Sequence, residues 1–180
     1  IERDDLSSHA SGRAYAGLMS YEPSQEIIER YARLLVDFAL GDGDGIKQGD
    51  TVWVVGSEET KPLFAECCRA VWRSGGNVIQ QLDIREDDRF NLQRDFYEMA
   101  SDAQLDYFPA KYRRGQIDEI DHMLFIDGTD FPQSMKGVDP QKMMRRQATF
   151  MPVMQWRQEK EAAGLLHWTI GLWGTEAMAA

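Results

Sequence analysis

The chain has 180 residues, of which 43% are hydrophobic and 28% are charged, and its formal net charge is −10. This balance is typical of one soluble globular domain with a sizeable core. A strongly acidic chain repels phosphate backbones, so we expect no nucleic-acid partner. No apolar run approaches the roughly 20 residues that span a bilayer, and no signal peptide is visible, so we expect no membrane partner.

The first 20 residues have no clear periodicity and are predicted to form a mobile leader, in which His9 is solvent-exposed. The first firm element is a helix that begins at Ser24, a good N-cap, and ends at Gly41. Apolar residues follow one another at helical spacing along it: Ile27, Ile28, Tyr31, Leu34, Leu35 and Phe38.

A strand, a helix and a second strand follow within about 30 residues. The run Thr51–Val55 is apolar and β-branched, which predicts a strand buried on both faces and therefore a parallel sheet. The helix is expected over 60–74, with Leu63, Phe64, Cys67, Ala70 and Val71 directed inward, and the second strand over 77–82. This order is that of a βαβ unit.

The remaining elements continue the alternation of helices and strands. A polar loop is expected at 83–90, followed by helices over 91–100, from Ser101, and over 109–119, a strand over 121–126, one long helix over 139–163 and a strand over 167–173. The pattern predicts a three-layer α/β fold, with a mostly parallel sheet and flanking helices as in Rossmann and flavodoxin-like proteins. Because the last segment, 174–180, is apolar, we expect a larger protein to continue beyond it.

The stretch GDGDG at 41–45 is acidic and rich in glycine, but it fits no ligand motif. An EF-hand loop counted from Asp42 would place Ile46 and Lys47 where an oxygen ligand and a glycine are needed. A phosphate-binding loop follows a strand and precedes a helix, whereas this stretch follows a helix and precedes a strand. We therefore predict a connector.

Gly56-Ser57-Glu58-Glu59 is better placed, because it follows a strand and precedes a helix. Ligands of open α/β sheets collect at the carboxyl ends of the strands. One glycine and two acids make a weak nucleotide fingerprint, while acids at a helix start are favourable for structural reasons alone.

No stretch has the spacing of a metal or nucleophile motif. His122 and His167 each begin a predicted strand without a neighbouring ligand, and we interpret both as structural, although they could converge in space. Cys67 and Cys68 point about 100° apart on a helix, so they cannot bind one metal together. Two adjacent cysteines make no disulfide framework, and reduced thiols predict a cytoplasmic protein.

The predicted long helix carries Met143, Met144, Phe150, Met151, Met154 and Trp156 at helical spacing. Such a stripe is more often core than part of a cofactor site, and it equally suits a subunit contact. The cations that alternate with it are interpreted as the solvated face: Arg145, Arg146, Arg157 and Lys160.

Six stretches taken together carry a family resemblance over residues 25–180: YARLLVDFALGDGDGIKQGDTVWVVG, KPLFAECCRAVWRSGGNVI, DDRFNLQRDFYEMASDAQLDYFP, IDHMLFIDG, GVDPQKMMRRQATFMPVMQWRQEKEAAG and HWTIGLWGTEAMA. In this order they resemble the amino-terminal part of the M29 family of metallopeptidases, the aminopeptidase T or thermophilic leucyl aminopeptidase type.

The resemblance implies a two-domain, dimeric enzyme of about twice this length that removes amino-terminal residues from peptides with a pair of divalent metals, zinc or cobalt. It also implies that the metal ligands lie in the carboxyl-terminal half, outside this chain. We therefore assign no catalytic, cofactor-binding or metal-binding residue here, and we expect no cofactor in this segment.

Two hypotheses follow. In the first, residues 21–180 are the amino-terminal domain of an M29-type aminopeptidase, serving as a scaffold, an access or a dimer domain and inactive alone. In the second, the chain is a free-standing α/β module that binds a ligand at the Gly56-Ser57 strand end.

Overall fold

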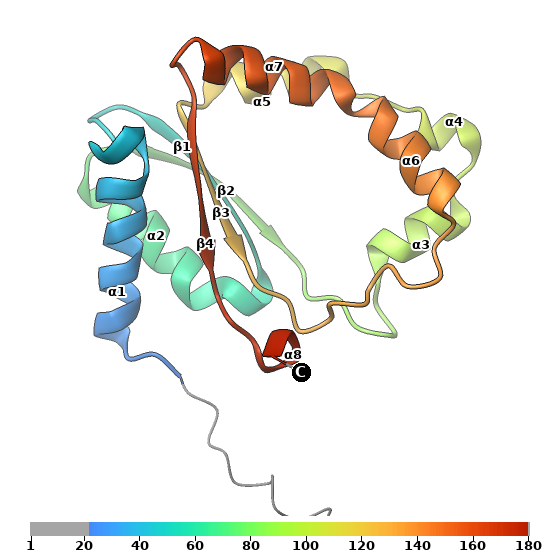
Figure 1. Cartoon of the computed structure of the whole chain (residues 1–180), viewed down its shortest axis with the longest axis horizontal. Coiled ribbons are helices and arrows are strands. Elements are labelled where there is room, and N and C mark those ends of the chain that lie inside the picture. Colours follow the sequence, from blue (N-terminus) through green and yellow to red (C-terminus); the bar gives the residue numbers. More distant parts are fainter. Residues whose placement is uncertain (1–21, 180) are drawn as a thin grey trace, which may run out of the picture.

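The computed structural model describes residues 22–179, so the predicted leader at 1–20 lies outside the described part of the chain. Four parallel strands form one sheet in the order β2-β1-β3-β4 (Figure 1). Their bounds are Thr51–Ser57 for β1, Asn77–Asp83 for β2, His122–Asp127 for β3 and His167–Leu172 for β4. The predicted α/β class and the parallel sheet are confirmed.

Helices α1 (Gln25–Leu34) and α2 (Lys61–Arg73) cover one face of the sheet and enclose the main core. Ser24 caps α1 as predicted, and the helix continues through a π-helical turn at Leu35–Ala39. The five residues predicted to point inward on α2 are all buried. The stripe predicted on α1 is only partly buried, because Ile28 and Leu35 face the core whereas Ile27, Leu34 and Phe38 are exposed.

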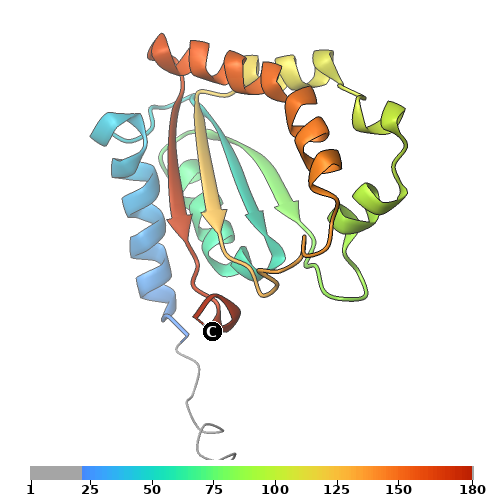
Figure 2. The same ribbon diagram turned by 45° about the vertical axis from the view of Figure 1, so that its right-hand side comes forward.

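The opposite face carries a third layer at the end where the strands begin. There α5 (Ala110–Glu119) and α7 (Met151–Ala162) lie across the sheet (Figure 2). A second core forms between them and the sheet from Ile117, Ile120, Met123 and Leu166, packed against Trp53 and Trp156 among others. Strand β1 therefore has one fully buried face, and its other face is only half-buried.

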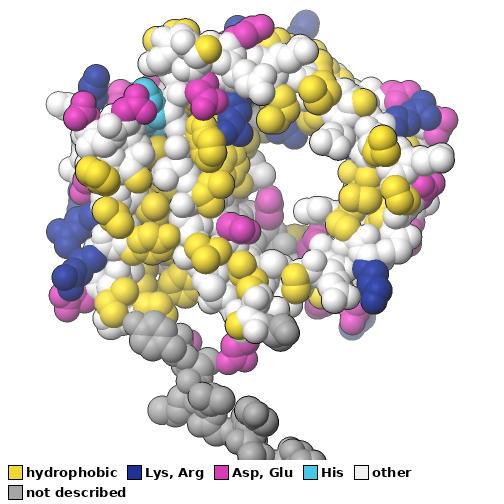
Figure 3. Space-filling model, in the orientation of Figure 1, with side chains coloured by type: hydrophobic (Ala, Val, Ile, Leu, Met, Phe, Trp, Pro, Cys, Tyr) yellow, Lys and Arg dark blue, Asp and Glu magenta, His cyan; other side chains and the backbone are white. Residues whose placement is uncertain are grey.

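Three helices form an arm at the side of the sheet: α3 (Leu92–Met99), α4 (Asp102–Leu105) and α6 (Pro140–Thr149). Figure 3 shows an opening between this arm and the sheet. A last helix, α8 (Glu176–Ala179), follows β4. No helix in the described part of the chain has both the length and the apolar character needed to cross a membrane.

The single long helix predicted over 139–163 is wrong, because the structure divides it into α6 and α7 at Phe150. Pro152 explains the break. Proline has no N–H to donate to the carbonyl of Ala148, and its ring clashes with that carbonyl inside a continuous helix. At the second position of a new helix the missing N–H carries no penalty. Asp139 caps α6 as predicted.

The interpretation of the methionine and aromatic stripe as core is wrong for Met144, Met151 and Met154, which are exposed. Trp156 packs against the second core, and the subunit contact stays a prediction.

Of the four cations interpreted as solvated, Arg145 is exposed as predicted, whereas Arg146, Arg157 and Lys160 are half-buried. All four contact groups of neighbouring elements. Arg145 pairs with Asp102 and Asp106, and Arg146 donates to the carbonyls of Leu105 and Tyr107. The Arg157 guanidinium lies over the rings of Phe125 and Trp168. Lys160 donates to three carbonyls at the end of α5.

Candidate functional site

The carboxyl ends of β1 and β3 form the point at which the sheet changes direction. From β1 the chain passes through α2 on one face to β2, and it returns through α5 on the other face to β3, on the far side of β1. Connections that leave in opposite directions create the crevice where open α/β sheets bind ligands. Ser57 ends β1 at this point, and Gly128 follows β3.

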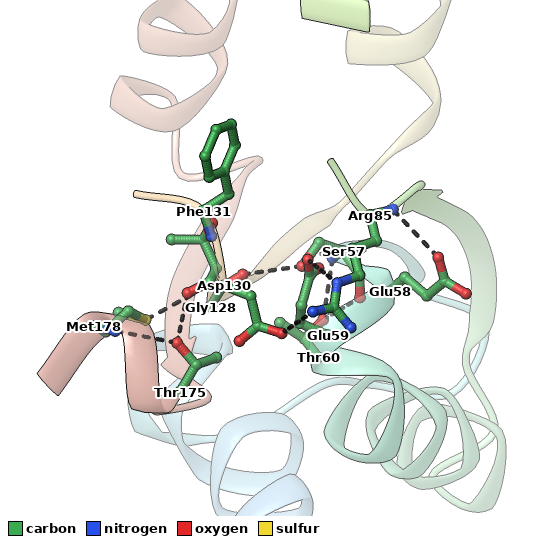
Figure 4. A network of polar contacts seen from close by, with 11 residues as sticks. Ser57, Glu58, Glu59, Thr60, Arg85, Gly128, Asp130, Phe131, Thr175 and Met178 are labelled. Atoms are coloured by element: carbon green, nitrogen blue, oxygen red, sulfur yellow. Dashed lines mark hydrogen bonds and ion pairs between the residues drawn. The ribbon is translucent and has the colours of Figure 1, made fainter. Parts of the chain in front are cut away.

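Hydrogen bonds tie the two strand ends together at this crevice (Figure 4), and a pocket of about 380 Å³ lined by Ser57, Asp83 and Gly128 among others lies beside them. The Ser57 N–H donates to Thr60 Oγ1 over 3.1 Å, and the Thr60 hydroxyl donates back to the Ser57 carbonyl over 2.8 Å. Ser57 Oγ donates to the Gly128 carbonyl over 2.9 Å, which bridges β1 and β3. A Cβ on Gly56 would lie 2.5 Å from Thr60 Oγ1, and one on Gly128 would lie 2.6 Å from the Trp173 carbonyl. Both glycines therefore serve close packing.

Acidic side chains and one arginine surround the hydrogen bond between Ser57 and Gly128. The Arg85 guanidinium lies 3.0 Å from Asp130 Oδ2 and 3.9 Å from Glu59 Oε1, and the Arg85 N–H donates to Glu58 Oε2 over 3.2 Å. Glu58 and Glu59 occupy the first turn after β1, where a phosphate would have to lie. This arrangement disfavours an anionic ligand, so a nucleotide at the Gly56-Ser57 strand end fits poorly.

A cleft of about 760 Å³ opens beside these residues, between the start of α1 and the segment that follows β4. Its lining combines apolar and acidic side chains: Pro23, Ile27, Ile28, Tyr31, Leu172 and Trp173 with Glu22, Glu58, Glu59, Asp130 and Glu176, together with Arg85, Gly174 and Thr175. Sequence reasoning found the Gly56–Glu59 turn but missed Arg85, Asp130 and Glu176. The signal that could have found them is that each follows a predicted strand.

At the opposite edge of the sheet, the structure brings the two histidines together. His122 and His167 pair across β3 and β4, and their ring centroids are 5.5 Å apart. His122 is buried with its Nε2 2.9 Å from Asp50 Oδ2, while Nδ1 has no hydrogen-bond partner in the described structure. Burial raises the pKa of Asp50, but the Lys47 N–H and His122 outweigh this effect and leave the pKa lowered.

The GDGDG stretch links the first helix to β1 as predicted. Gly41 is left-handed with φ 65°, and a short 3-10 turn covers Gly41–Gly43. Gly45 lies against the Asp37 carbonyl, which leaves no room for a side chain. Asp42 extends to His167, 3.3 Å from its Nδ1. The stretch therefore closes the amino edge of the sheet beside the histidine pair.

No metal-ligand set fits either edge. Among residues 22–179, no three or more His, Cys, Asp or Glu side chains are placed to hold a metal ion. A zinc site needs three or four converging ligands, so no catalytic step through a metal follows from these residues. Cys67 and Cys68 are free and buried.

The fold defines the class of the protein as an α/β domain with an open parallel sheet. The sequence model of the M29 family, described as thermophilic metalloprotease, matches residues 24–180, and the chain belongs to this family. Among solved structures, wild-type AmpT from Thermus thermophilus is similar, with 20% identity and a TM-score of 0.63 over 82% of this chain. The chain covers 36% of AmpT. No curated protein sequence matches it significantly.

Proposed function

We propose that this chain is the amino-terminal domain of a metal-dependent aminopeptidase, which removes amino-terminal residues from peptides with metal-activated water. The observation that carries the proposal is the match to the M29 metalloprotease family over residues 24–180. The similarity to AmpT supports the fold, and the 36% coverage of that chain is consistent with a further domain in the parent protein. A zinc or cobalt pair in that further domain would activate the water.

In this proposal the domain serves as scaffold, limits access to the catalytic half and contributes to a homodimer. The exposed Met144, Met151 and Met154 support a protein contact, because methionine packs adaptably and is favoured in interfaces. The buried, unpaired thiols of Cys67 and Cys68 are consistent with a reducing, cytoplasmic location. Peptides are the proposed partners, rather than nucleic acid or membranes.

The test is an aminopeptidase assay of residues 1–180 with leucine p-nitroanilide, in the presence of Zn²⁺ or Co²⁺. We expect no turnover above the metal alone, and we expect metal-dependent turnover from the complete parent protein. Turnover by residues 1–180 that a chelator abolishes would overturn the assignment of catalysis to another domain. Absence of activity in the parent protein would overturn the aminopeptidase function itself.

The alternative is a free-standing α/β module with a ligand at the Gly56-Ser57 strand end. Its position at the carboxyl edge favours it, whereas the acids around it do not. A thermal-shift screen with nucleotides and flavins distinguishes the two. Saturable stabilisation would support the module, and the absence of any shift would count against it.

A further inference from the structure

We propose that His167 and Asp42 form a pH-sensitive contact that fastens the GDGDG stretch at 41–45 to the amino edge of the sheet, and that His122 directs the proton to His167. This stretch joins the first helix to β1, and the proposed peptidase function does not use it. Protonation of His167 closes the contact, and loss of that proton releases it. The fold therefore contains a conformational device that responds to pH.

The GDGDG stretch has few bonds to the rest of the domain. In the described structure, the N–H groups of Asp44 and Gly45 donate to carbonyls within residues 40–45. The approach of Asp42 Oδ1 to His167 Nδ1 at 3.3 Å is the one ionic contact between this stretch and a strand among residues 22–179. Hollows of about 170 and 360 Å³ lie beside the contact, and both side chains line each of them. The stretch therefore has room to move when the contact is released.

The backbone of Asp42 is held in an uncommon conformation. With φ 58° and ψ 30°, it is the single non-glycine residue with a positive φ in the described part of the chain. Gly41 and Gly43 on either side also have positive φ, 65° and 99°. Left-handed backbone is unfavourable for a residue with a side chain, although aspartate tolerates it better than most. The contact with His167 offsets this cost, so the stretch should relax when the contact weakens.

His122 determines which ring takes the proton. Its Nε2 lies 2.9 Å from Asp50 Oδ2, so the hydrogen bond holds one proton on Nε2. A second proton on its buried Nδ1 would be a donor without an acceptor, because that atom has no partner in the described structure. Two charged rings with centroids 5.5 Å apart would also repel each other. His167 is more exposed, at 26% of its side chain, and its Nδ1 faces Asp42.

The charged groups around the two rings favour one positive charge. Carboxylates from four neighbouring elements and a single lysine line the two hollows: Asp42 and Asp44 of the stretch, Asp50 before β1, Asp121 before β3, Glu161 of α7, and Lys47. An imidazole gains its second proton between about pH 5 and 8, where carboxylates in general are ionised. The contact should therefore close as the pH falls from about 8 to 5.5 and open as the pH rises again.

Two-dimensional NMR of residues 1–180 between about pH 8 and 5.5 tests the proposal. We expect the ring resonances of His167 to titrate, and the amide resonances of Gly41 and Gly43 to shift with the same midpoint. In His167→Gln, the glycine amides should no longer shift in this range. Glycine amides that do not shift in the unaltered chain, or that shift equally in His167→Gln, would overturn the proposal. Titration of the His122 ring in place of His167 would also overturn it.

Unfolding in urea connects the effect to the charge of Asp42. Asp42→Asn removes the charge and keeps a residue that tolerates left-handed backbone. Its midpoint should lie about 0.3 M below that of the unaltered chain at pH 5.5 and less than about 0.1 M below it at pH 8. The matched control is Asp44→Asn, an exposed acid of the same stretch without an ionic contact in the described structure, which should show no such pH dependence.

An equal loss at both pH values in Asp42→Asn, or the same pH dependence in Asp44→Asn, would refute the contact. His167→Gln provides the same comparison if Asp42→Asn fails to fold. These measurements do not involve peptidase activity, so the parent protein's peptidase assay tests the proposed function separately.

Discussion

Lys160 provides the sharpest test of how the third layer is held on the sheet. It lies on α7, and its Nζ donates to the carbonyls of Ile117, Asp118 and Ile120 over 2.9, 3.0 and 2.6 Å. The first two carbonyls belong to the last turn of α5, where a helix leaves its acceptors without internal partners. The negative end of the helix dipole adds to the attraction of an ammonium group. We therefore expect Lys160→Met to weaken the contact between α5 and α7.

The size of the effect follows from these three bonds. Hydrogen bonds to a charged group contribute about 1.5–3 kcal/mol, and two of the three acceptors are only partly buried, so water compensates part of the loss. We expect a loss of about 2 kcal/mol in the free energy of unfolding. A lysine on a solvated face would change the stability by less than about 0.5 kcal/mol.

Urea unfolding followed by tryptophan fluorescence measures this difference. With an m-value of about 2 kcal/mol per M, the midpoint of Lys160→Met should fall by about 1 M at unchanged m. The control is Lys111→Met, an exposed lysine at the start of α5, for which we expect no shift. Equal midpoints for the two variants would refute the tether and support the solvated face that the sequence pattern predicts.

Three further predictions concern packing and ionisation. Gly128→Ala should lower the free energy of unfolding by about 1–3 kcal/mol in a urea titration, because its Cβ would clash with the Trp173 carbonyl, and an unchanged midpoint would contradict the packing at the bridge. Burial raises the pKa of Cys67 to about 12 and that of Cys68 to about 11, so both thiols should resist a disulfide reagent at pH 8 until urea is added. Rapid reaction of the native chain would show that the thiols are not buried. Burial raises the pKa of Glu66, but hydrogen bonds led by Arg69 outweigh this effect and leave the pKa lowered. The stabilisation by the ionised Glu66 carboxylate should be complete above the unfolded-state pKa of about 4.5 and should disappear as the pH falls through the lower pKa of the folded state. Glu66→Gln should therefore lower the free energy of unfolding more at neutral pH than in acid. An equal loss at every pH would contradict the lowered pKa.

Much of the fold could be predicted because its signals are local. The apolar run at Thr51–Val55 predicts a strand whose observed ends lie within two residues of the prediction, and the capping residue Ser24 predicts the observed start of α1. The prediction of one long helix is wrong although the sequence contains the signal for the break, because Pro152 begins a new helix after Phe150. The roles of the cations could not be predicted, because an alternating pattern does not specify which carbonyls and rings a long side chain reaches across the fold.

The sites were harder to predict because they depend on which strands are neighbours. His122 and His167 are separated by 44 intervening residues and meet only because β3 and β4 pair in register. The same applies to Glu59, Arg85 and Asp130, which follow three different strands, β1, β2 and β3, and meet at the strand ends. The sequence predicted the turn after β1 as a position for a ligand. The acidic cleft beside this turn could not be predicted, because its lining depends on the order of the strands and on the position of α1.

In the proposed function, the metal chemistry of the parent protein lies outside residues 22–179, among which no group of metal ligands is placed to hold an ion. Equilibrium dialysis of residues 1–180 against micromolar Zn²⁺ or Co²⁺, followed by elemental analysis, measures metal per chain most directly. We expect no stoichiometric metal in residues 1–180 and about two ions per chain in the complete parent protein. Retention of one or two ions by residues 1–180, with the visible absorption of tightly coordinated Co²⁺, would contradict it.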